Sequence, residues 1–144
     1  MNGQLIFDAS SILILLKLLG EEALDALRSG STISLAYYEV GNGIWRECLL
    51  LKRIGLKEAL KVLKTVFGIL QKMNVVSLEG EEVGEPILDL AVKLGITYYD
   101  ASYLTEALRT GKTLVTDDEK LSEAAKLVGV KTLTSKDLAK ISHN

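Results

Sequence analysis

Short apolar runs alternate with longer stretches in which apolar residues recur at helical spacing. The short runs are rich in Val, Ile, Leu and Thr, a pattern typical of buried strands. It predicts strands over Leu5–Asp8, Thr32–Leu35, Asn74–Leu78, Thr113–Thr116 and Val130–Leu133.

The intervening stretches predict helices, several of them ended by glycine. These helices are expected over Ser10–Leu19, Glu21–Arg28, Tyr37–Arg53, Leu56–Lys72, a segment ending near Leu94, Asp100–Arg109 and Glu119–Leu127, followed by a short C-terminal helix. Pro86, the only proline, is expected in the first turn of its helix, because an interior proline costs roughly 3 kcal/mol. Strands alternating with helices predict a single α/β domain over residues 1–144. Its fold class is a three-layer α/β/α sandwich with a central, mainly parallel sheet.

Acidic residues recur where predicted strands end. Asp8, Glu39 and the pair Asp117–Asp118 follow strands, and Asp100 is expected to open a helix at the same edge. Each could be an ordinary helix cap or a solvated charge. Together, four carboxylates at the edge where sites of open sheets lie would raise each other's pKa unless a cation compensates. Mg²⁺ and Mn²⁺ are hard ions that suit such oxygen ligands.

Three polar residues stand beside these acids. Ser10 comes two residues after Asp8, Asn42 three residues after Glu39, and Thr116 directly before Asp117. Each could donate a hydrogen bond to a carboxylate or to a metal-bound water. A cap or a turn hydrogen bond explains each of them equally well.

Composition excludes several classes of protein. The net charge of −2 rules out nucleic-acid binding driven by a global positive field. Cys48, the only cysteine, cannot form an internal disulfide, and the opening residues lack the basic segment of a secretory signal, so we expect the cytoplasm. No apolar stretch is long enough for a membrane span. The only histidine, His143, stands one residue from the C-terminus, which argues against Ser-His-Asp chemistry.

Four segments, taken in order, resemble the PIN-domain family of metal-dependent ribonucleases, and more narrowly the VapC-type toxins of toxin–antitoxin pairs. Asp8-Ala9-Ser10 is similar to the family's opening Asp-x-Ser/Asn, and Tyr38-Glu39-Val40-Gly41-Asn42 to its Glu-x-x-Asn helix. Tyr99-Asp100-Ala101-Ser102-Tyr103-Leu104 resembles its Tyr-Asp-Ala-x-Tyr-Leu segment. Leu114–Leu121 resembles its closing Thr-x-Asp-x-x-Leu/Phe.

The resemblance implies an endoribonuclease that hydrolyses RNA phosphodiester bonds with Mg²⁺ or Mn²⁺. Asp8, Glu39, Asp100 and Asp118 would hold the metal, which activates water and neutralises transition-state charge. The family spacing selects Asp118 over Asp117, and Asp117 is kept as an auxiliary acid.

The stretch Leu49-Leu50-Leu51 bears on partners. Three consecutive residues cover about 200° of a helix, so the helix is either buried on two sides within the monomer or part of a protein interface. The resemblance favours an interface, and we expect a homodimer that also binds a small antitoxin. Arg46, Lys52 and Arg53 are candidates for RNA phosphate contacts, with solvated surface charge as the alternative.

Two other functions fit less well. A receiver-type phosphoacceptor domain has the same architecture, but it needs a lone Asp on a central strand, and Asp100 is expected to open a helix. A catalytically silent PIN-like RNA- or protein-binding module would be expected to lack part of the acidic set, and no acid is missing.

Overall fold

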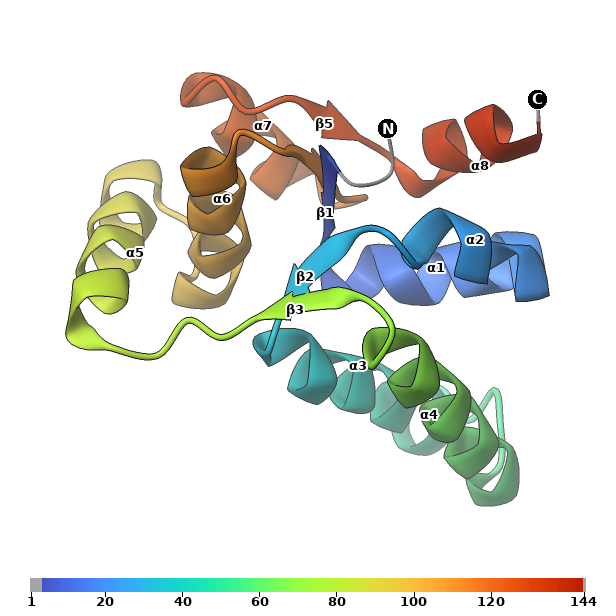
Figure 1. Ribbon diagram of the computed structural model, residues 1–144. Helices are drawn as coiled ribbons and strands as arrows, with labels where there is room; N and C mark the ends of the chain where they lie inside the picture. The colour runs from blue at the N-terminus through green and yellow to red at the C-terminus, as the bar shows by residue number, and fades with distance from the viewer. Residues whose placement is uncertain (1–3, 144) are drawn as a thin grey trace.

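A five-stranded parallel sheet forms the middle of the protein in the computed structural model, which describes residues 4–143, with side chains described as far as Ile141 (Figure 1). The strands are β1 (Leu5–Phe7), β2 (Ser31–Ile33), β3 (Asn74–Val76), β4 (Thr113–Val115) and β5 (Thr132–Leu133). Their order is β3-β2-β1-β4-β5, and every pair is parallel. The chain therefore builds outward from β1 to one edge and returns past β1 to the other. This reversal of strand order beside β1 is where ligand sites of open parallel sheets form.

Helices cover both faces of this sheet and form two hydrophobic cores. The helical elements are α1 (Ala9–Leu19), η2 (Gly20–Glu22), α2 (Ala23–Leu27), α3 (Leu35–Trp45), η3 (Arg46–Leu50), α4 (Leu56–Leu70), α5 (Glu81–Leu94), α6 (Tyr98–Thr110), α7 (Glu119–Leu127) and α8 (Ser135–His143). One core joins the sheet to α1–α4 and α8, and the other joins it to α5–α7.

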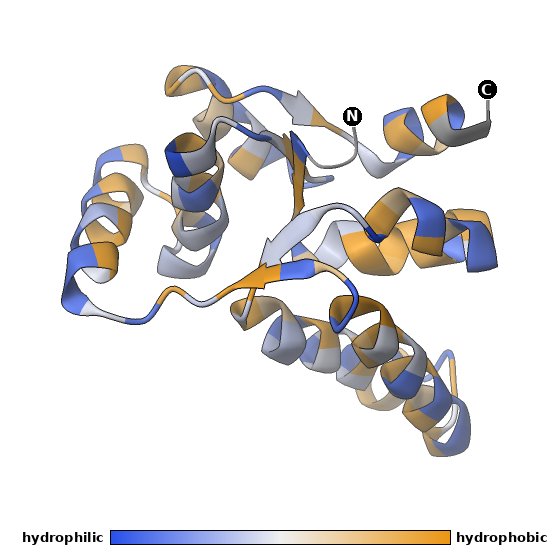
Figure 2. Ribbon diagram, in the orientation of Figure 1, coloured by the Kyte–Doolittle hydropathy of each residue, from blue (hydrophilic) through white to orange (hydrophobic). Residues whose placement is uncertain are grey.

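Alternation along the central strands divides their side chains between the two cores. In β1, Leu5 and Phe7 enter the first core and Ile6 enters the second, and all three are buried. The strand is apolar along its length because both of its faces are covered (Figure 2). The predicted three-layer α/β/α fold is thus confirmed.

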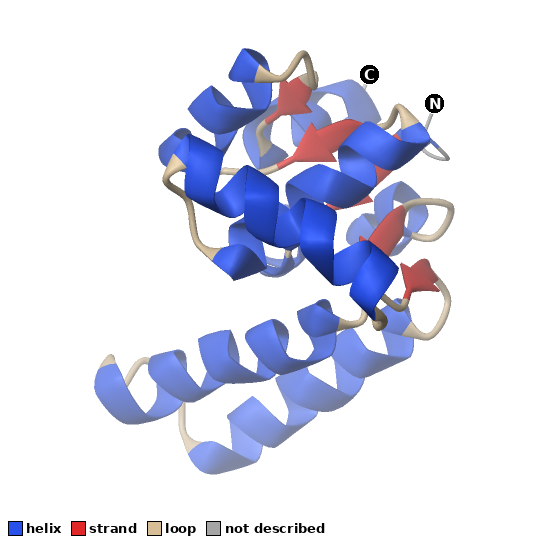
Figure 3. Cartoon of the chain, turned by 90° about the vertical axis from the view of Figure 1, so that its left-hand side faces the viewer, coloured by secondary structure: helices blue, strands red, loops and turns tan. Residues whose placement is uncertain are grey.

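Helices α3 and α4 lie side by side and extend from the sheet as an arm (Figure 3). The prediction of one continuous helix as far as Arg53 was wrong in detail. The α-helical part ends at Trp45, and Arg46–Leu50 continues with the wider π-type turn. The alternative in which Leu49, Leu50 and Leu51 are buried on two sides was also wrong, since all three are about half exposed.

Two predicted element boundaries near the strands need correction. Leu35 was assigned to a strand, but β2 stops at Ile33 and Leu35 begins α3. The predicted helix Glu21–Arg28 is instead a 3₁₀ turn followed by the short helix α2. Leu35 is apolar and fits either a strand or a helix, so the pattern could not locate that boundary, and the 3₁₀ turn at Gly20–Glu22 contains no apolar side chain from which periodicity could be read.

Pro86 lies inside α5 and not in its first turn. The helix begins five residues earlier, at Glu81, after Gly80 with φ of 125°. The carbonyl of Gly80 accepts the N–H groups of Val83 and Gly84, at 3.2 and 2.9 Å, and these bonds form the first turn. The prediction was wrong because the helix begins at Glu81, so Pro86 falls beyond the first turn.

No helix within the described residues is long and apolar enough to cross a membrane. The His143 side chain lies outside the described residues.

Candidate active site

Asp8 joins the end of β1 to the start of α1. Its N–H extends the strand ladder by donating to the Val115 carbonyl, at 3.2 Å. Its side chain then caps α1, because Oδ1 accepts the Ser11 N–H at 2.8 Å. The residue is only 7% exposed. Burial raises the pKa of the Asp8 carboxyl, and hydrogen bonds from Thr116 and Ser11 oppose that rise.

Thr116 connects this carboxylate to the end of β4. Its buried hydroxyl hydrogen-bonds the Asp8 side chain and also accepts the Asp118 N–H, at 3.1 Å. Asp118 then caps α7, since its Oδ1 accepts the Leu121 N–H at 3.0 Å. One hydroxyl thus fixes the relative positions of two acid-bearing helix starts.

Asp117 has a different set of partners. Its Oδ1 accepts the Ser135 N–H at 2.9 Å, and its Oδ2 accepts the Ser135 hydroxyl in a short hydrogen bond. Both carboxylate oxygens are therefore committed to the first residue of α8. The Asp117 charge still reaches the site, because it contributes to the raised pKa of Asp8.

Glu39 projects from the second turn of α3, the helix that follows β2. The Tyr103 hydroxyl donates to its Oε1 at 2.8 Å. The pKa of Glu39 is raised, first by partial burial and then by the charges of Asp100 and Asp8, while Tyr103 lowers it. Tyr103 itself is fully buried, and both burial and the neighbouring Glu39 raise its pKa. It therefore remains a neutral hydrogen-bond donor.

Asp100 is the third residue of α6, not its first. Thr97 is the N-cap, and its Oγ1 accepts the Asp100 N–H at 3.0 Å. The Thr97 hydroxyl also hydrogen-bonds the Asp100 carboxylate. The pKa of Asp100 is raised by burial and next by the Asp118 charge, while the Thr97 hydrogen bond and then Lys120 lower it.

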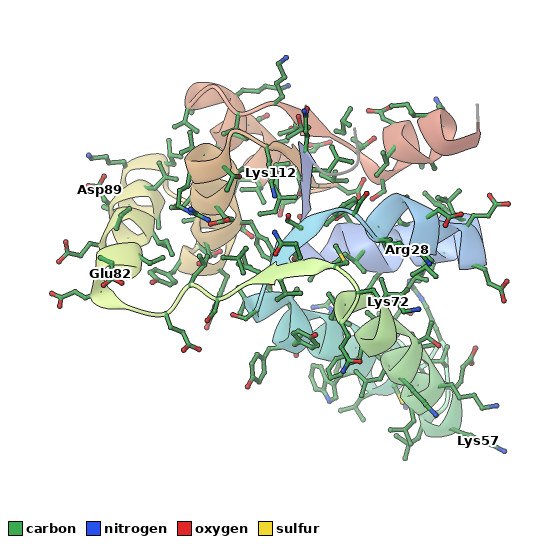
Figure 4. The ribbon with its side chains drawn as sticks, in the orientation of Figure 1. Arg28, Lys57, Lys72, Glu82, Asp89 and Lys112 are labelled. Atoms are coloured by element: carbon green, nitrogen blue, oxygen red, sulfur yellow. The ribbon has the colours of Figure 1, made fainter. Side chains whose placement is uncertain are left out.

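The predicted acids are linked by charge interactions between neighbours. Asp8 interacts with Asp117 and Glu39, Glu39 with Asp100, and Asp100 with Asp118. The ion pairs between described residues join other acids, Glu47, Asp89 and Glu106, to basic side chains. Several further charged groups point outward from α2, α4 and α5 (Figure 4). The site is thus predominantly negative, with Lys120 acting on Asp100 as a counter-charge.

The donor set suits a hard divalent ion, because it consists of carboxylates with a hydroxyl among them. Within residues 4–141, however, no three acids already lie close enough together to hold one ion. Mutual repulsion favours such a spread arrangement, and a cation would remove that repulsion. The chemistry of the donor set thus suits a divalent ion, while the carboxylates as described stand too far apart for three of them to hold one ion together.

The remaining predicted site residues lie farther out. Ser10 and Asn42 are exposed, and neither side chain makes a hydrogen bond to a described acid. Arg46, Lys52 and Arg53 are exposed on and after η3, and Arg53 donates to Glu47 at 3.3 Å.

Sequence reasoning did not single out four residues that contact the acids: Ser11, Thr97, Tyr103 and Ser135. Tyr103 could have been found, because it stands three residues after Asp100 and therefore on a neighbouring part of the same helix face. Ser11 could have been found as the residue three positions after a capping Asp.

Comparison with known proteins defines the class. Residues 6–127 match the PIN domain family, so the chain belongs to the PIN-domain family. This family membership argues against the alternative of a receiver-type phosphoacceptor domain.

Its relatives within that family are more specific. The chain is 34% identical over 106 residues to Ribonuclease VapC3 of Pyrobaculum aerophilum, covering 72% of this chain and 76% of the relative. It is also 34% identical over 102 residues to Exonuclease VapC9 of the same organism, covering 70% and 71%. The chain is thus similar to VapC proteins, as its four motifs indicated.

Solved structures share the fold. The crystal structure of PAE2754 from Pyrobaculum aerophilum superposes with a TM-score of 0.78 at 24% identity, covering 97% of this chain and 96% of that chain. A toxin–antitoxin complex from Klebsiella pneumoniae gives 0.60 at 19% identity, covering 90% and 96%. FitAcB from Neisseria gonorrhoeae gives 0.61 at 16% identity, covering 92% and 98%.

Proposed function

We propose that this protein is a Mg²⁺- or Mn²⁺-dependent endoribonuclease that hydrolyses RNA phosphodiester bonds, and that it is the toxin of a toxin–antitoxin pair. The observation that carries the proposal is the set of charge interactions that link Asp8, Glu39, Asp100 and Asp118. These acids come from four separate segments, three of them have raised pKa values, and none of them forms an ion pair with a described residue.

Asp8, Glu39, Asp100 and Asp118 would hold the metal, and one oxygen of Asp8 and of Asp118 is already fixed by helix capping. A bound divalent ion would supply Lewis acidity, and it would lower the pKa of water so that a nucleophile is available at neutral pH. The chain's own contribution is to orient the ligands. Thr116 fixes Asp8 relative to Asp118, and Tyr103 holds Glu39. We assign Asp117 the auxiliary role of tethering α8, because Ser135 occupies both of its oxygens.

The relatives support nuclease activity, while their names differ on its mode, since one is called a ribonuclease and the other an exonuclease. Internal cleavage is therefore tested directly. Linear and covalently circular forms of the same single-stranded RNA are incubated with Mn²⁺, and separately with EDTA. An endonuclease cuts both forms and an exonuclease leaves the circle intact.

Variants test the site in the same assay. Asp8→Asn and Asp100→Asn should abolish cleavage, while Asp89→Asn should not, because Asp89 is an exposed partner of Lys93 on α5. Activity that persists in EDTA or in both site variants would refute the proposed mechanism. Absence of cleavage by the unaltered protein would favour the catalytically silent module.

Two protein partners are also proposed, a second copy of the chain and a small antitoxin. Their support is apolar surface near the arm. Leu49, Leu50 and Leu51 are exposed, and a groove of about 620 Å³ lies between α1 and the α3–α4 arm, with Ile14 and Ile54 among its lining residues. Light scattering should give a dimer that Leu50→Glu converts to monomer. A monomer at every accessible concentration would contradict the dimer.

Toxicity and RNA contact can be tested separately. Expression in bacterial cells should arrest growth, Asp8→Asn should not, and co-expression of a small protein encoded next to the gene should restore growth. Arg46 and Lys52 are proposed to contact RNA phosphates, so Arg46→Gln should weaken binding to all sequences alike. Cytoplasmic location is part of this proposal.

A further inference from the structure

An aromatic pocket opens beside the acidic site. It has a volume of about 640 Å³ and lies between the start of α3, the start of α6 and the segment after β3. Five of the eight aromatic residues in the chain line it: Tyr37, Tyr38, Phe67, Tyr98 and Tyr99. Such a concentration in one pocket calls for a ligand that binds aromatic faces.

Chain connectivity sets the pocket against the acids. Tyr38 directly precedes Glu39 on α3, and Tyr99 directly precedes Asp100 on α6. None of the four proposed ligands lines the pocket, but two of them directly follow residues that do. The pocket is thus next to the proposed catalytic residues along both helices.

The tyrosines differ in how much they serve the fold. Tyr37 packs against Phe67 edge to face, with ring centroids 5.0 Å apart, and both rings are partly buried. By contrast, Tyr38 is 81% exposed and Tyr99 is 58% exposed. Rings this exposed add little to the hydrophobic core, so their faces remain available for stacking.

The charge of the lining excludes a phosphate as occupant. Glu79 is the only charged residue among the lining residues, and it would repel an anion. A flat, uncharged group with hydrogen-bonding edges fits the rings and the carboxylate together. Nucleobases have this character, and they stack on aromatic side chains without regard to sequence.

We propose that this pocket binds a nucleobase of single-stranded RNA next to the phosphate that is cleaved, with Tyr38 and Tyr99 as the stacking residues. This inference rests on the proposed nuclease function. It adds a positioning role, in which the pocket fixes the strand through a base while the acids act on the adjoining phosphate.

The test uses the full-length protein, Mn²⁺ and a short single-stranded RNA that it cleaves. Tyr38→Ala and Tyr99→Ala should each raise KM by about 5- to 150-fold, the range for loss of one base–aromatic stack, with a smaller effect on kcat. Tyr38→Phe and Tyr99→Phe keep the ring and should behave like the unaltered protein. Trp45→Ala removes an exposed aromatic ring of α3 that does not line the pocket, and it should leave KM unchanged.

Two further measurements locate the base. A series of RNAs with one abasic position each should show a single position beside the cleavage point whose loss raises KM, and Tyr38→Ala should cancel that effect. A 2-aminopurine at the same position should lose fluorescence on binding in EDTA, and it should not do so with Tyr38→Ala.

The outcomes separate the two proposals. If the unaltered protein neither binds nor cleaves RNA, the nuclease function and the base pocket both fail. If it cleaves RNA but the alanine variants and the abasic series leave KM unchanged, only the base pocket fails. If the alanine variants cleave normally but lose dimerisation or antitoxin binding, the pocket belongs to a protein interface and the inference is overturned.

Discussion

Replacing Tyr103 with phenylalanine tests whether the network around Glu39 orients a metal ligand. The Tyr103 hydroxyl is buried, donates to Glu39 Oε1 at 2.8 Å and accepts the N–H of Ala9. Phenylalanine keeps the ring and removes both hydrogen bonds. A net hydrogen bond contributes roughly 0.5–1.5 kcal/mol, so the two bonds together contribute about 1–3 kcal/mol. Because Glu39 is only half buried and water can replace its lost donor, we expect the lower half of that range.

The effect on metal binding should be larger than the effect on folding. Loss of a residue that orients a metal ligand typically weakens affinity 10- to 100-fold, which is about 1.4–2.7 kcal/mol. The pKa of Glu39 is already raised by burial, and Tyr103 is the group that lowers it. Removing Tyr103 therefore raises that pKa further. Since a metal ligand must be deprotonated, the fall in affinity on acidification should begin at a higher pH in the variant.

Calorimetric titration with Mn²⁺ at several pH values, with urea unfolding of the metal-free protein, measures both effects. Tyr98→Phe is the matched control. It removes a tyrosine hydroxyl two residues before Asp100 that makes no side-chain hydrogen bond to a described residue. If Tyr103→Phe is folded and binds Mn²⁺ with unaltered affinity and pH dependence, then Tyr103 does not orient a ligand and Glu39 loses its place in the metal site.

Three other predictions follow from the same contacts. Asp117→Ala should lower the free energy of unfolding by about 1–3 kcal/mol, because it leaves two groups of Ser135 without their partner. Asp118→Asn keeps the α7 cap and should mainly lose Mn²⁺ affinity. Urea unfolding and calorimetry measure the two effects, and the opposite result would exchange the roles of the two acids. The folded-state pKa values of Asp8, Glu39 and Asp100 are raised, so the metal-free protein should gain stability as pH falls from neutral towards their ordinary values near 4. Asp100→Asn should reduce the slope of unfolding free energy against pH, measured by urea unfolding. An equal slope in the variant would contradict this prediction. Gly30→Ala should destabilise the folded protein by about 1–3 kcal/mol, because a Cβ there would lie 2.5 Å from a Phe7 ring carbon. In the control Gly68→Ala the new Cβ meets nothing within 4 Å, so that variant should be neutral or stabilising. Equal melting temperatures for the two variants would refute this account of β1 packing.

The layer architecture was readable from the sequence because the central strands are apolar on both sides. Leu5, Ile6 and Phe7 leave no polar face, which is how a strand covered by helices on both faces reads. Leu35 and Pro86 show where this reasoning stops. Leu35 is apolar in either a strand or a helix, and Pro86 lies inside α5 because Gly80 starts that helix one turn earlier than periodicity suggested.

Most of the acids could be found from the sequence because they follow strands, with Asp100 near a helix start, but their hydrogen-bond partners could not. Ser11, Thr116 and Ser135 decide which carboxylate oxygens remain free, and only Thr116 had been singled out. The Ser135–Asp117 contact spans 18 residues and depends on how α8 returns to the sheet. Local pattern carries no information about such a contact. The aromatic pocket was equally hidden, since its tyrosine pairs come from helices about 60 residues apart in the chain.

Capping and the proposed metal binding are compatible roles for the same side chain. Asp8 and Asp118 each use Oδ1 to accept a helix N–H, and the cap fixes the carboxylate at the sheet edge. Asparagine would cap these helices about as well, so capping alone does not require a negative charge. At Asp8 the charge is costly, because burial raises its pKa and Asp117 adds to that rise. A charge that the fold neither needs nor neutralises is best explained by a cation that it binds. The helix N-terminus then has a second use, since the Ser11 N–H that Asp8 caps also opposes the rise in the pKa of Asp8.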